Sequence, residues 1–325
     1  MTKSTRLLVL LFCAALTSLI VSVSSGSMTL TFGQLWQALT TGSESLAHTL
    51  IWELRIPRAI TAFVVGAMLS IAGALMQVIL RNPLADPYIL GVSGGASVAA
   101  LLAMLAGIAS IGVSLSAFFG ALLSTLLVFG IAHGTGSWSP MKVLLTGVVL
   151  ASGWGALISL ILAISPDQGL RSMLYWLMGD FGYSSSYGWA SLALLIGIAS
   201  SYYLARPLNL LLHGSVQAAS LGVSVEKVYL IIFIIASFLT AVSVSMAGNI
   251  GFVGLIVPHL VRLSIGSDHR TLLPASLLLG GTLMVIADLL ARTLFSPQQL
   301  PVGVITALLG VPLFLFILYR GQRKF

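Results

Sequence analysis

The sequence has 325 residues, of which 58% are hydrophobic and only 7% are charged, and its mean hydropathy is +1.07. Charged residues make up about a quarter of an ordinary soluble domain, so this composition excludes a soluble globular protein. The apolar runs are continuous rather than alternating, which excludes a β-barrel. The net charge of +7 comes without a basic cluster interleaved with aromatic residues, so nucleic-acid binding is also rejected. We therefore predict an all-α polytopic membrane protein.

Ten apolar segments are predicted to span the membrane within one transmembrane domain that covers residues 1–325, since a span needs about 20 apolar residues. The segments are 7–24, 58–80, 90–108, 114–133, 141–163, 189–205, 228–247, 250–265, 272–291 and 302–319. Those at 90–108 and 250–265 are short and rich in glycine. Irregular backbone is tolerated at membrane depth only inside a bundle, so we expect these two segments in the interior. A short surface helix is expected over 31–40.

The orientation follows from the distribution of lysine and arginine. With the N-terminus inside, eleven of the 15 basic residues fall on the inner side and four on the outer side. Positive charge concentrates on the cytoplasmic side of membrane proteins. The chain is therefore expected to have both termini in the cytoplasm, together with the stretch 206–227, and to have two longer outer connections near 25–57 and 164–188.

The stretch 206–227, named the platform from here on, contains two apolar runs that are too short to cross a bilayer. Pro207 begins the first run and Gly214 ends it, while Leu221 and Gly222 end the second, a pattern typical of two short helices. We interpret the platform as a cytoplasmic docking surface for another protein. The alternative is a long loop that packs on its own bundle.

The sequence lacks the groups that would let the chain act as an enzyme. It contains no phosphate-binding loop, no Cys/His cluster with metal-ligand spacing and no nucleophile elbow. No catalytic or metal-binding residue and no bound cofactor are therefore predicted. Asp288 is the acidic residue inside a predicted span, and its spacing from Arg292 favours a local i,i+4 ion pair. Because no ion relay is visible, we expect the energy for any activity to come from a partner at the platform.

Three basic residues on the outer side lie at the ends of predicted spans: Arg55, Arg58 and Arg292. They are named the outer arginines. They could anchor the helices at the membrane surface. Because arginine pairs with carboxylates in a bidentate geometry, we interpret them instead as a docking patch for acidic residues of an external protein. A secondary carrier or channel that works alone and a purely structural membrane scaffold are the rival interpretations. The first would need an ion site at the midplane.

The chain resembles the permease subunits of type II ATP-binding-cassette importers, the family that takes up ferric siderophores, haem and cobalamin. The resemblance covers nearly the whole chain. It rests on these segments: 54–58 (LRIPR), 73–77 (GALMQ), 82–87 (NPLADP), 90–96 (LGVSGGA), 175–179 (YWLMG), 221–223 (LGV), 251–259 (GFVGLIVPH), 268–270 (DHR), 287–292 (ADLLAR) and 301–306 (PVGVIT).

This resemblance implies a set of partners and a location. Two permease chains form a dimer, expected here as a homodimer, around a central path. Two cytoplasmic ATP-binding subunits use ATP and Mg, and a periplasmic binding protein meets the outer arginines through its glutamates. The expected location is the bacterial inner membrane, in contact with the lipid bilayer. The residues implied to couple to the ATPase are Val216, Gln217, Ala218, Ser220, Leu221, Gly222 and Val223.

The resemblance also implies a cytoplasmic gate and a class of cargo. The gate is expected at Asn82 and Leu84 and at the start of the fifth span, at Pro140 and Met141. The cobalamin permease has small hydroxyl residues at the last two positions, so this sequence departs from the cobalamin pattern there. We therefore expect a ferric siderophore as cargo, with cobalamin or haem as the alternative for the same machinery.

Overall fold

The computed structural model describes residues 3–26, 31–40, 45–133, 140–182 and 187–321. Its described residues form α-helices without a strand, joined by short turns, with a π-helical stretch at Leu50–Arg55 and a 3-10 turn at Pro87–Leu90. The helices are α1 (Lys3–Ser24), α2 (Phe32–Thr40), α3 (Leu46–Thr49), α4 (Ile56–Ile79), α5 (Val92–Leu105), α6 (Ser110–His133), α7 (Pro140–Ile164), α8 (Asp167–Met178), α9 (Gly188–Tyr203), α10 (Ala205–Leu211), α11 (Ser215–Ser220), α12 (Val225–Ala247), α13 (Val253–Ile265), α14 (His269–Thr293) and α15 (Val302–Gly321). The all-α fold class is confirmed.

Each of the ten predicted spans coincides with one of these helices, and the surface helix expected over 31–40 is α2. By length and composition, six helices of the described chain could cross a membrane, and α9 with the sharply bent α10 could be a seventh. The other three predicted spans are the shorter apolar helices α5, α13 and α15. At about 1.5 Å per residue, a helix as short as α5 or α13 does not cross the hydrocarbon core by itself.

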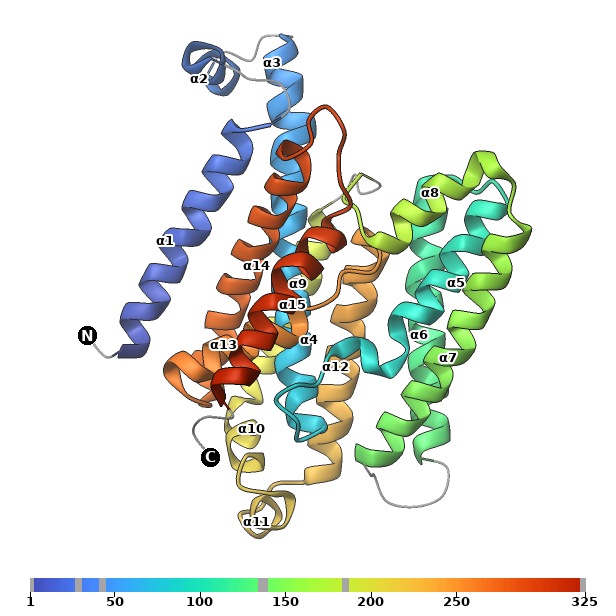
Figure 1. The fold of residues 1–325 in the computed structure, drawn as a ribbon. Coiled ribbons are helices and arrows are strands. Elements are labelled where there is room, and N and C mark those ends of the chain that lie inside the picture. The colour runs from blue at the N-terminus through green and yellow to red at the C-terminus, as the bar shows by residue number, and fades with distance from the viewer. Residues whose placement is uncertain (1–2, 27–30, 41–44, 134–139, 183–186, 322–325) are drawn as a thin grey trace.

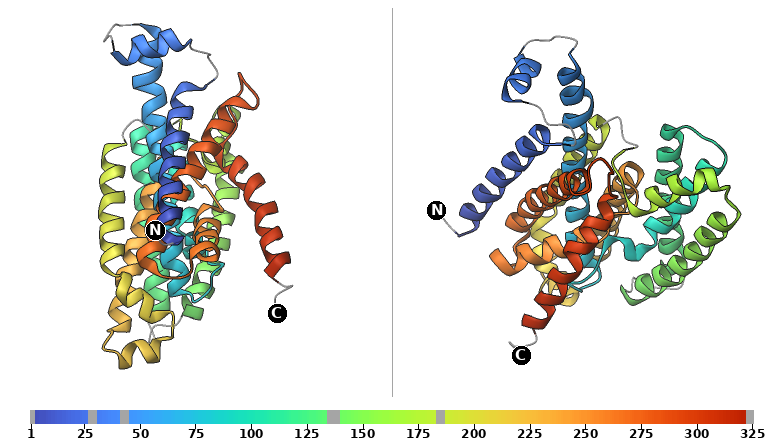
Figure 2. Two further views of the ribbon diagram at one scale, coloured as in Figure 1. Left: turned by 90° about the vertical axis from the view of Figure 1, so that its left-hand side faces the viewer. Right: turned by 45° about the horizontal axis from the view of Figure 1, so that its top comes forward.

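Helix α4 lies at the centre of the molecule. Nearly all its residues from Ala59 to Ile79 are buried, and it packs against α14, α12, α13 and α9. A second group, α5, α6 and α7, packs together beside this centre and joins it mainly through α12 (Figure 1). Helix α1 lies on the opposite flank, against α14, and α15 crosses the bundle obliquely (Figure 2).

Glycines allow the central helices to approach closely. A side-chain carbon added at Gly66 would overlap the backbone of Gly280 on α14, and one added at Gly73 would overlap the backbone of Gly254 on α13. Small residues at such positions let membrane helices pack with their backbones in contact, where van der Waals packing replaces the hydrophobic effect. Thus α4, α13 and α14 form a tightly packed centre.

The two glycine-rich segments lie largely inside, as expected from their irregular backbone. One face of α5 is buried against α6 and α7, and the irregular break before α13 contains the buried Ile250. The backbone N–H of Ile250 donates to the hydroxyl of Tyr88 at 3.2 Å. A side chain thus satisfies a backbone group that lipid could not satisfy.

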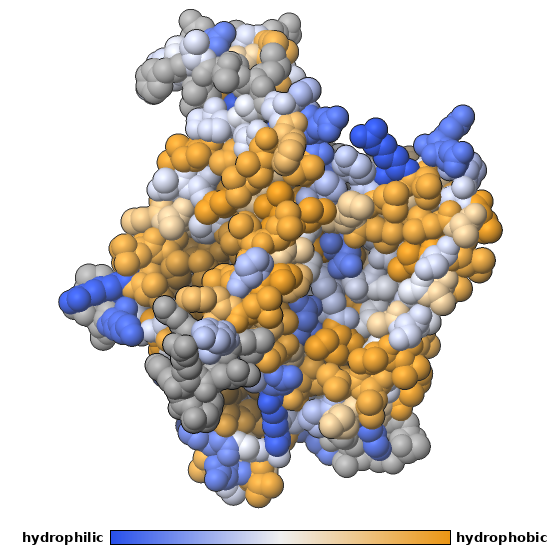
Figure 3. Space-filling view, in the orientation of Figure 1, coloured by the Kyte–Doolittle hydropathy of each residue, from blue (hydrophilic) through white to orange (hydrophobic). Residues whose placement is uncertain are grey.

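The ends of the molecule are polar, whereas its sides are apolar (Figure 3). Helices α1 and α7 expose most of their apolar residues. Both described ends of the chain lie on the side of α10 and α11 or towards it, whereas α2, α3 and α8 lie at the opposite end (Figure 1). An exposed apolar surface of this size is covered by lipid or by another membrane protein.

Candidate functional site

The platform forms two short helices, α10 and α11, at one end of the bundle, as the sequence predicts (Figure 1). Gly214, with a φ of 110°, separates them. Ala218 is buried and seats α11 on its neighbours, whereas Val216 is 83% exposed and Leu221 is 67% exposed. The platform therefore presents two apolar side chains at a tip that the described residues leave uncovered. Of the remaining predicted coupling residues, Gln217, Ser220 and Gly222 are exposed and Val223 is half-buried.

The turn after α11 explains why Gly222 stands at this position. Gly222 has a φ of 84°, which a residue with a side chain adopts only with strain. The backbone N–H of Val223 donates to Ala218 O at 3.0 Å, and that of Gly222 donates to Ala219 O at 2.9 Å. These two bonds are the Schellman arrangement that ends a helix and reverses the chain. Gly222 thereby holds Leu221 at the exposed tip.

The outer arginines lie near one another but bind groups of their own chain. Arg55 donates to the carbonyl oxygens of Val23 and Ser24 at 3.0 and 3.1 Å, at the C-terminal end of α1, where a cation is favoured by the helix dipole. The carboxylate of Asp288 is fully buried and accepts from Arg58 Nε at 2.8 Å and from Arg292 Nε at 2.9 Å. The predicted i,i+4 pair between Asp288 and Arg292 is therefore confirmed.

The same network ties together four segments that are distant in sequence. Arg292 also donates to Ser22 Oγ on α1 at 2.9 Å. Arg58 reaches Asp180 Oδ1 at 3.3 Å and Gln299 Oε1 at 3.2 Å. These long-range partners could not be predicted from the sequence, because Asp180 and Gln299 lie outside the predicted spans and in no regular pattern. The docking role of the outer arginines stays a prediction, and the side chain of Arg58 is 15% exposed whereas that of Arg292 is 8% exposed.

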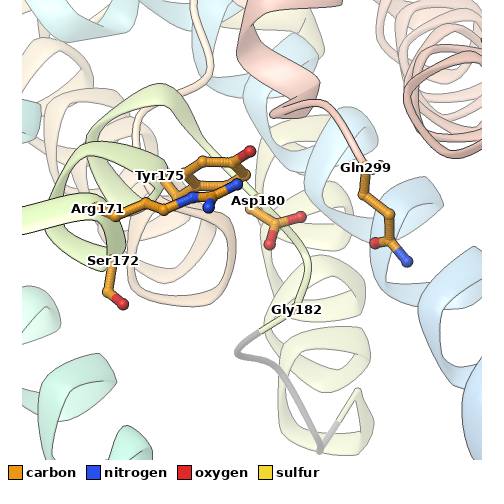
Figure 4. A pocket seen from close by; sticks show the side chains of 6 residues that line it. All are labelled: Arg171, Ser172, Tyr175, Asp180, Gly182 and Gln299. Atoms are coloured by element: carbon orange, nitrogen blue, oxygen red, sulfur yellow. The ribbon is translucent and has the colours of Figure 1, made fainter. Parts of the chain in front are cut away.

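An open polar depression of about 430 Å³ lies beside this network, on the same end of the molecule (Figure 4). It is lined by Arg171, Ser172, Tyr175, Asp180, Gly182 and Gln299. Arg171 is exposed on α8, lies 5.6 Å from the centre of the Tyr175 ring and forms no ion pair with the carboxylates of the described residues. The charge of Arg171 is therefore more accessible to an external protein than the charges of the outer arginines.

The predicted gate residues lie in two segments at the platform end. Asn82 is exposed in the turn after α4, and its Oδ1 accepts from the backbone N–H of Leu84 at 2.9 Å. Pro140 is the first residue of α7, and the neighbouring Met141 is exposed. The turn that contains Asn82 begins at Arg81, whose φ of 48° lies in the left-handed region. The gating role of these four residues stays a prediction.

Ionisable side chains in the described part of the chain make contacts within the protein rather than a metal site. Among the described residues, no group of three or more His, Cys, Asp or Glu side chains could hold a metal ion. The charged groups that do converge form one chain of ion pairs, from Arg292 through Asp288 and Arg58 to Asp180. These ion pairs hold segments of this protein together.

A multi-helix bundle with apolar sides, a short-helix platform at one end and a charge network at the other is an architecture that suits a membrane transport permease. The chain belongs to the FecCD transport family, whose model matches residues 8–320. It is 42% identical to the cobalamin import system permease protein of Halobacterium salinarum, over 87% of this chain and 79% of that protein. It is 38% identical to the hemin transport system permease protein of Yersinia pestis, over 98% of this chain and 95% of that protein.

A solved structure described as an inward-facing conformation of a metal-chelate type ABC transporter matches with a TM-score of 0.84 and 31% identity, covering 97% of this chain and 99% of that one. The chain is thus a multi-pass permease of the ABC importers that carry metal chelates, cobalamin or haem. Such permeases are membrane subunits and not enzymes themselves. Membership of the family implies ATPase and substrate-binding partners.

Proposed function

We propose that this chain is the permease subunit that carries a metal chelate, in the first place a ferric siderophore, from the periplasm into the cytoplasm across the bacterial inner membrane. In this proposal two copies of the chain form the permease dimer. Two separate subunits bind and hydrolyse ATP with Mg, and their closure moves the platform. The chain binds no cofactor of its own.

The observation that carries the proposal is the platform. Val216 and Leu221 are large apolar side chains exposed on a short, well-capped turn at a polar end of the molecule. An exposed apolar side chain in a polar rim is typical of an anchor for a protein partner. Residues 216–223 are therefore proposed to contact the ATP-binding subunits, with Leu221 as the central anchor.

The second copy of the chain is proposed from the surface of α7. This helix exposes a face that includes the small or polar residues Ser152, Gly153, Gly155 and Ser159 together with apolar ones. Small residues on such a face let a second helix approach closely and leave room for a solute beside it. We place the path between two copies of α7, with Pro140 and Met141 at its cytoplasmic end.

The charge network argues against the rival interpretation of an ion-coupled carrier. Asp288 is the buried carboxylate within a span, and both its oxygens accept from arginine. A carboxylate that is neutralised twice does not offer a site for a proton or a sodium ion during transport. A ferric siderophore is preferred over cobalamin because Pro140 and Met141 depart from the hydroxyl residues of the cobalamin permease; cobalamin and haem remain the alternative cargo.

The experiment replaces Leu221 by Asp in the complex with its ATP-binding subunits and binding protein, reconstituted in lipid vesicles. Leu221→Met is the matched control, because it keeps an apolar side chain of similar volume. Gly222 is avoided because its positive φ would confound a loss of contact with strain. We expect Leu221→Asp to lose co-purified ATP-binding subunits and ATP-driven uptake, and Leu221→Met to keep both.

The cargo is identified in the same vesicles by supplying a ferric hydroxamate, cyanocobalamin or haemin on the binding protein. ATP-driven uptake of the ferric hydroxamate alone supports the first choice, and uptake of one of the others replaces it. Undiminished uptake by Leu221→Asp in a folded complex refutes the platform as the ATPase contact. Uptake that depends on the membrane gradient and persists without ATP supports the secondary carrier.

A further inference from the structure

Asn209 on α10 connects the platform to the beginning of α14. Its Nδ2 donates to Asp268 Oδ1 at 2.6 Å, while its Oδ1 accepts from the backbone N–H of His269 at 2.8 Å and lies 2.8 Å from His269 Nδ1. Because an amide oxygen can only accept, Nδ1 of His269 carries the proton in this contact. The nitrogen and the oxygen of one side-chain amide thus form hydrogen bonds with two consecutive residues. We name these three residues the Asn209 bridge.

On the α14 side of the bridge, Asp268 is exposed to solvent whereas His269 lies inside the molecule. The side chain of His269 is fully buried. Asp268 caps α14 by accepting from the backbone N–H of Arg270 at 3.0 Å. That bond, followed by the bond from Asn209, lowers the pKa of Asp268 below its ordinary value, so the carboxylate is ionised at neutral pH and the hydrogen bond from Asn209 is charge-assisted.

The bridge differs from the other contacts of α10 in being directional. Leu208 and Leu211 of the same helix are buried, and such apolar contacts hold a helix against its neighbours without fixing its position along them. Hydrogen bonds are lost when donor and acceptor separate by roughly 1 Å or turn away from each other. The bridge therefore fixes the register between the platform and α14.

Helix α14 runs from the bridge to the charge network at the other end of the molecule. Midway, Gly280 lies so close to Gly66 and Ser70 of α4 that an added side-chain carbon would overlap both. At its far end, Asp288 and Arg292 pair as described above. The α14 helix thus joins the platform end to the outer arginines, with α4 packed tightly along it.

We infer that Asn209 is a positioning residue that transmits movement of the platform to α14 and, through α14, to the network of Asp288 and the outer arginines. The inference rests on the proposed function, because a partner must move the platform. Coupling in the opposite direction uses the same contacts. Binding of an external protein at the outer end shifts the position of α14, and the bridge transmits that shift to the platform, where the ATP-binding subunits are proposed to bind.

The test uses the full complex in lipid vesicles and measures three quantities: co-purification of the ATP-binding subunits, ATP hydrolysis with and without the binding protein, and ATP-driven uptake of the chelate that the wild type transports. Asn209→Ala removes the bridge. Asn209→Asp places a second carboxylate against Asp268. The double variant Asn209→Asp with Asp268→Asn restores one donor and one acceptor across the contact, and asparagine still caps a helix.

The matched control is Thr271→Ala. Its hydroxyl bonds to Asp268 O in the first turn of α14 at 3.1 Å, so the variant perturbs the same turn without touching the Asn209 bridge. We expect Asn209→Ala to bind the ATP-binding subunits normally but to lose about tenfold in stimulation of ATP hydrolysis by the binding protein, the scale of a lost hydrogen bond to a charged group. Asn209→Asp should lose more, the double variant should recover stimulation and uptake, and Thr271→Ala should behave as the wild type.

Three results overturn the inference: wild-type stimulation in Asn209→Ala, an equal loss in Thr271→Ala, or a loss that the double variant does not recover although its thermal midpoint is normal. A failure of the proposed function has a different signature, since the wild-type chain itself would then neither bind the ATP-binding subunits nor stimulate them. If the binding protein stimulates ATP hydrolysis equally in the wild type and in Asn209→Ala, the inference about Asn209 is refuted whereas the proposed function stands.

Discussion

The buried carboxylate of Asp288 gives the sharpest test of how the outer end is held together. Replacing Asp288 by Ala removes the acceptor of both Arg58 Nε and Arg292 Nε. Arg58 keeps Asp180 and Gln299 and partial contact with solvent. Arg292 keeps its hydrogen bond to Ser22 Oγ and is almost wholly buried. The variant therefore leaves the Arg292 cation without a counter-ion in a site with little solvent.

Removing one partner of a buried ion pair costs about 3–5 kcal/mol, and we expect Asp288→Ala to fall in this range. Arg292→Gln should cost less, about 1–3 kcal/mol, because Asp288 then keeps Arg58. The triple replacement of Arg58 and Arg292 by Met and of Asp288 by Leu should recover much of the loss, since an apolar set of similar volume carries no desolvation penalty.

The free energies are measured by unfolding in mixed micelles, followed by far-ultraviolet circular dichroism. The order of cost, Asp288→Ala above Arg292→Gln, is the decisive result, because it depends on which charge is left alone. A cost below about 1 kcal/mol for Asp288→Ala, the range of an exposed pair, would refute the reasoning and show that water reaches the network.

Three further predictions follow from single contacts. Gly280→Leu should destabilise the chain by at least about 1–3 kcal/mol through overpacking against α4. Gly130→Ala, which has no neighbour within 4 Å of the added carbon, should instead raise the unfolding free energy by up to about 1 kcal/mol, because alanine favours a helix over glycine. Burial raises the pKa of Asp86 from its ordinary value of 3.8 to about 6, so the folded state loses stability as pH rises from about 3.8 to about 6. Asp86→Asn should remove that decline in the thermal midpoint, and an unaltered pH profile would contradict it. Arg171→Glu should weaken association of the external binding protein and reduce its salt sensitivity more than Arg58→Gln does, as measured by surface binding at two ionic strengths; equal effects would indicate that Arg58 turns outward to dock.

The sequence alone determined the positions of the helices and the short-helix platform. Lipid leaves an uninterrupted apolar run few alternatives to a helix, which is why all ten predicted spans coincide with helices of the structure. Pro207, Gly214 and Gly222 are local signals with local consequences, so the two platform helices could be read from them. The pair of Asp288 and Arg292 was predictable for the same reason, since four residues separate its members on one helix.

Only the tertiary structure decided which partners the charged and polar residues find. Arg58 and Asp288 are 230 positions apart, and Asn209 and Asp268 are 59 apart, distances over which no periodicity links one residue to another. The sequence placed the outer arginines at the ends of helices but could not tell that Arg55 and Arg292 are buried, because burial depends on how α1, α4 and α14 pack. Packing that close depends in turn on glycines whose facing partner a single sequence does not reveal.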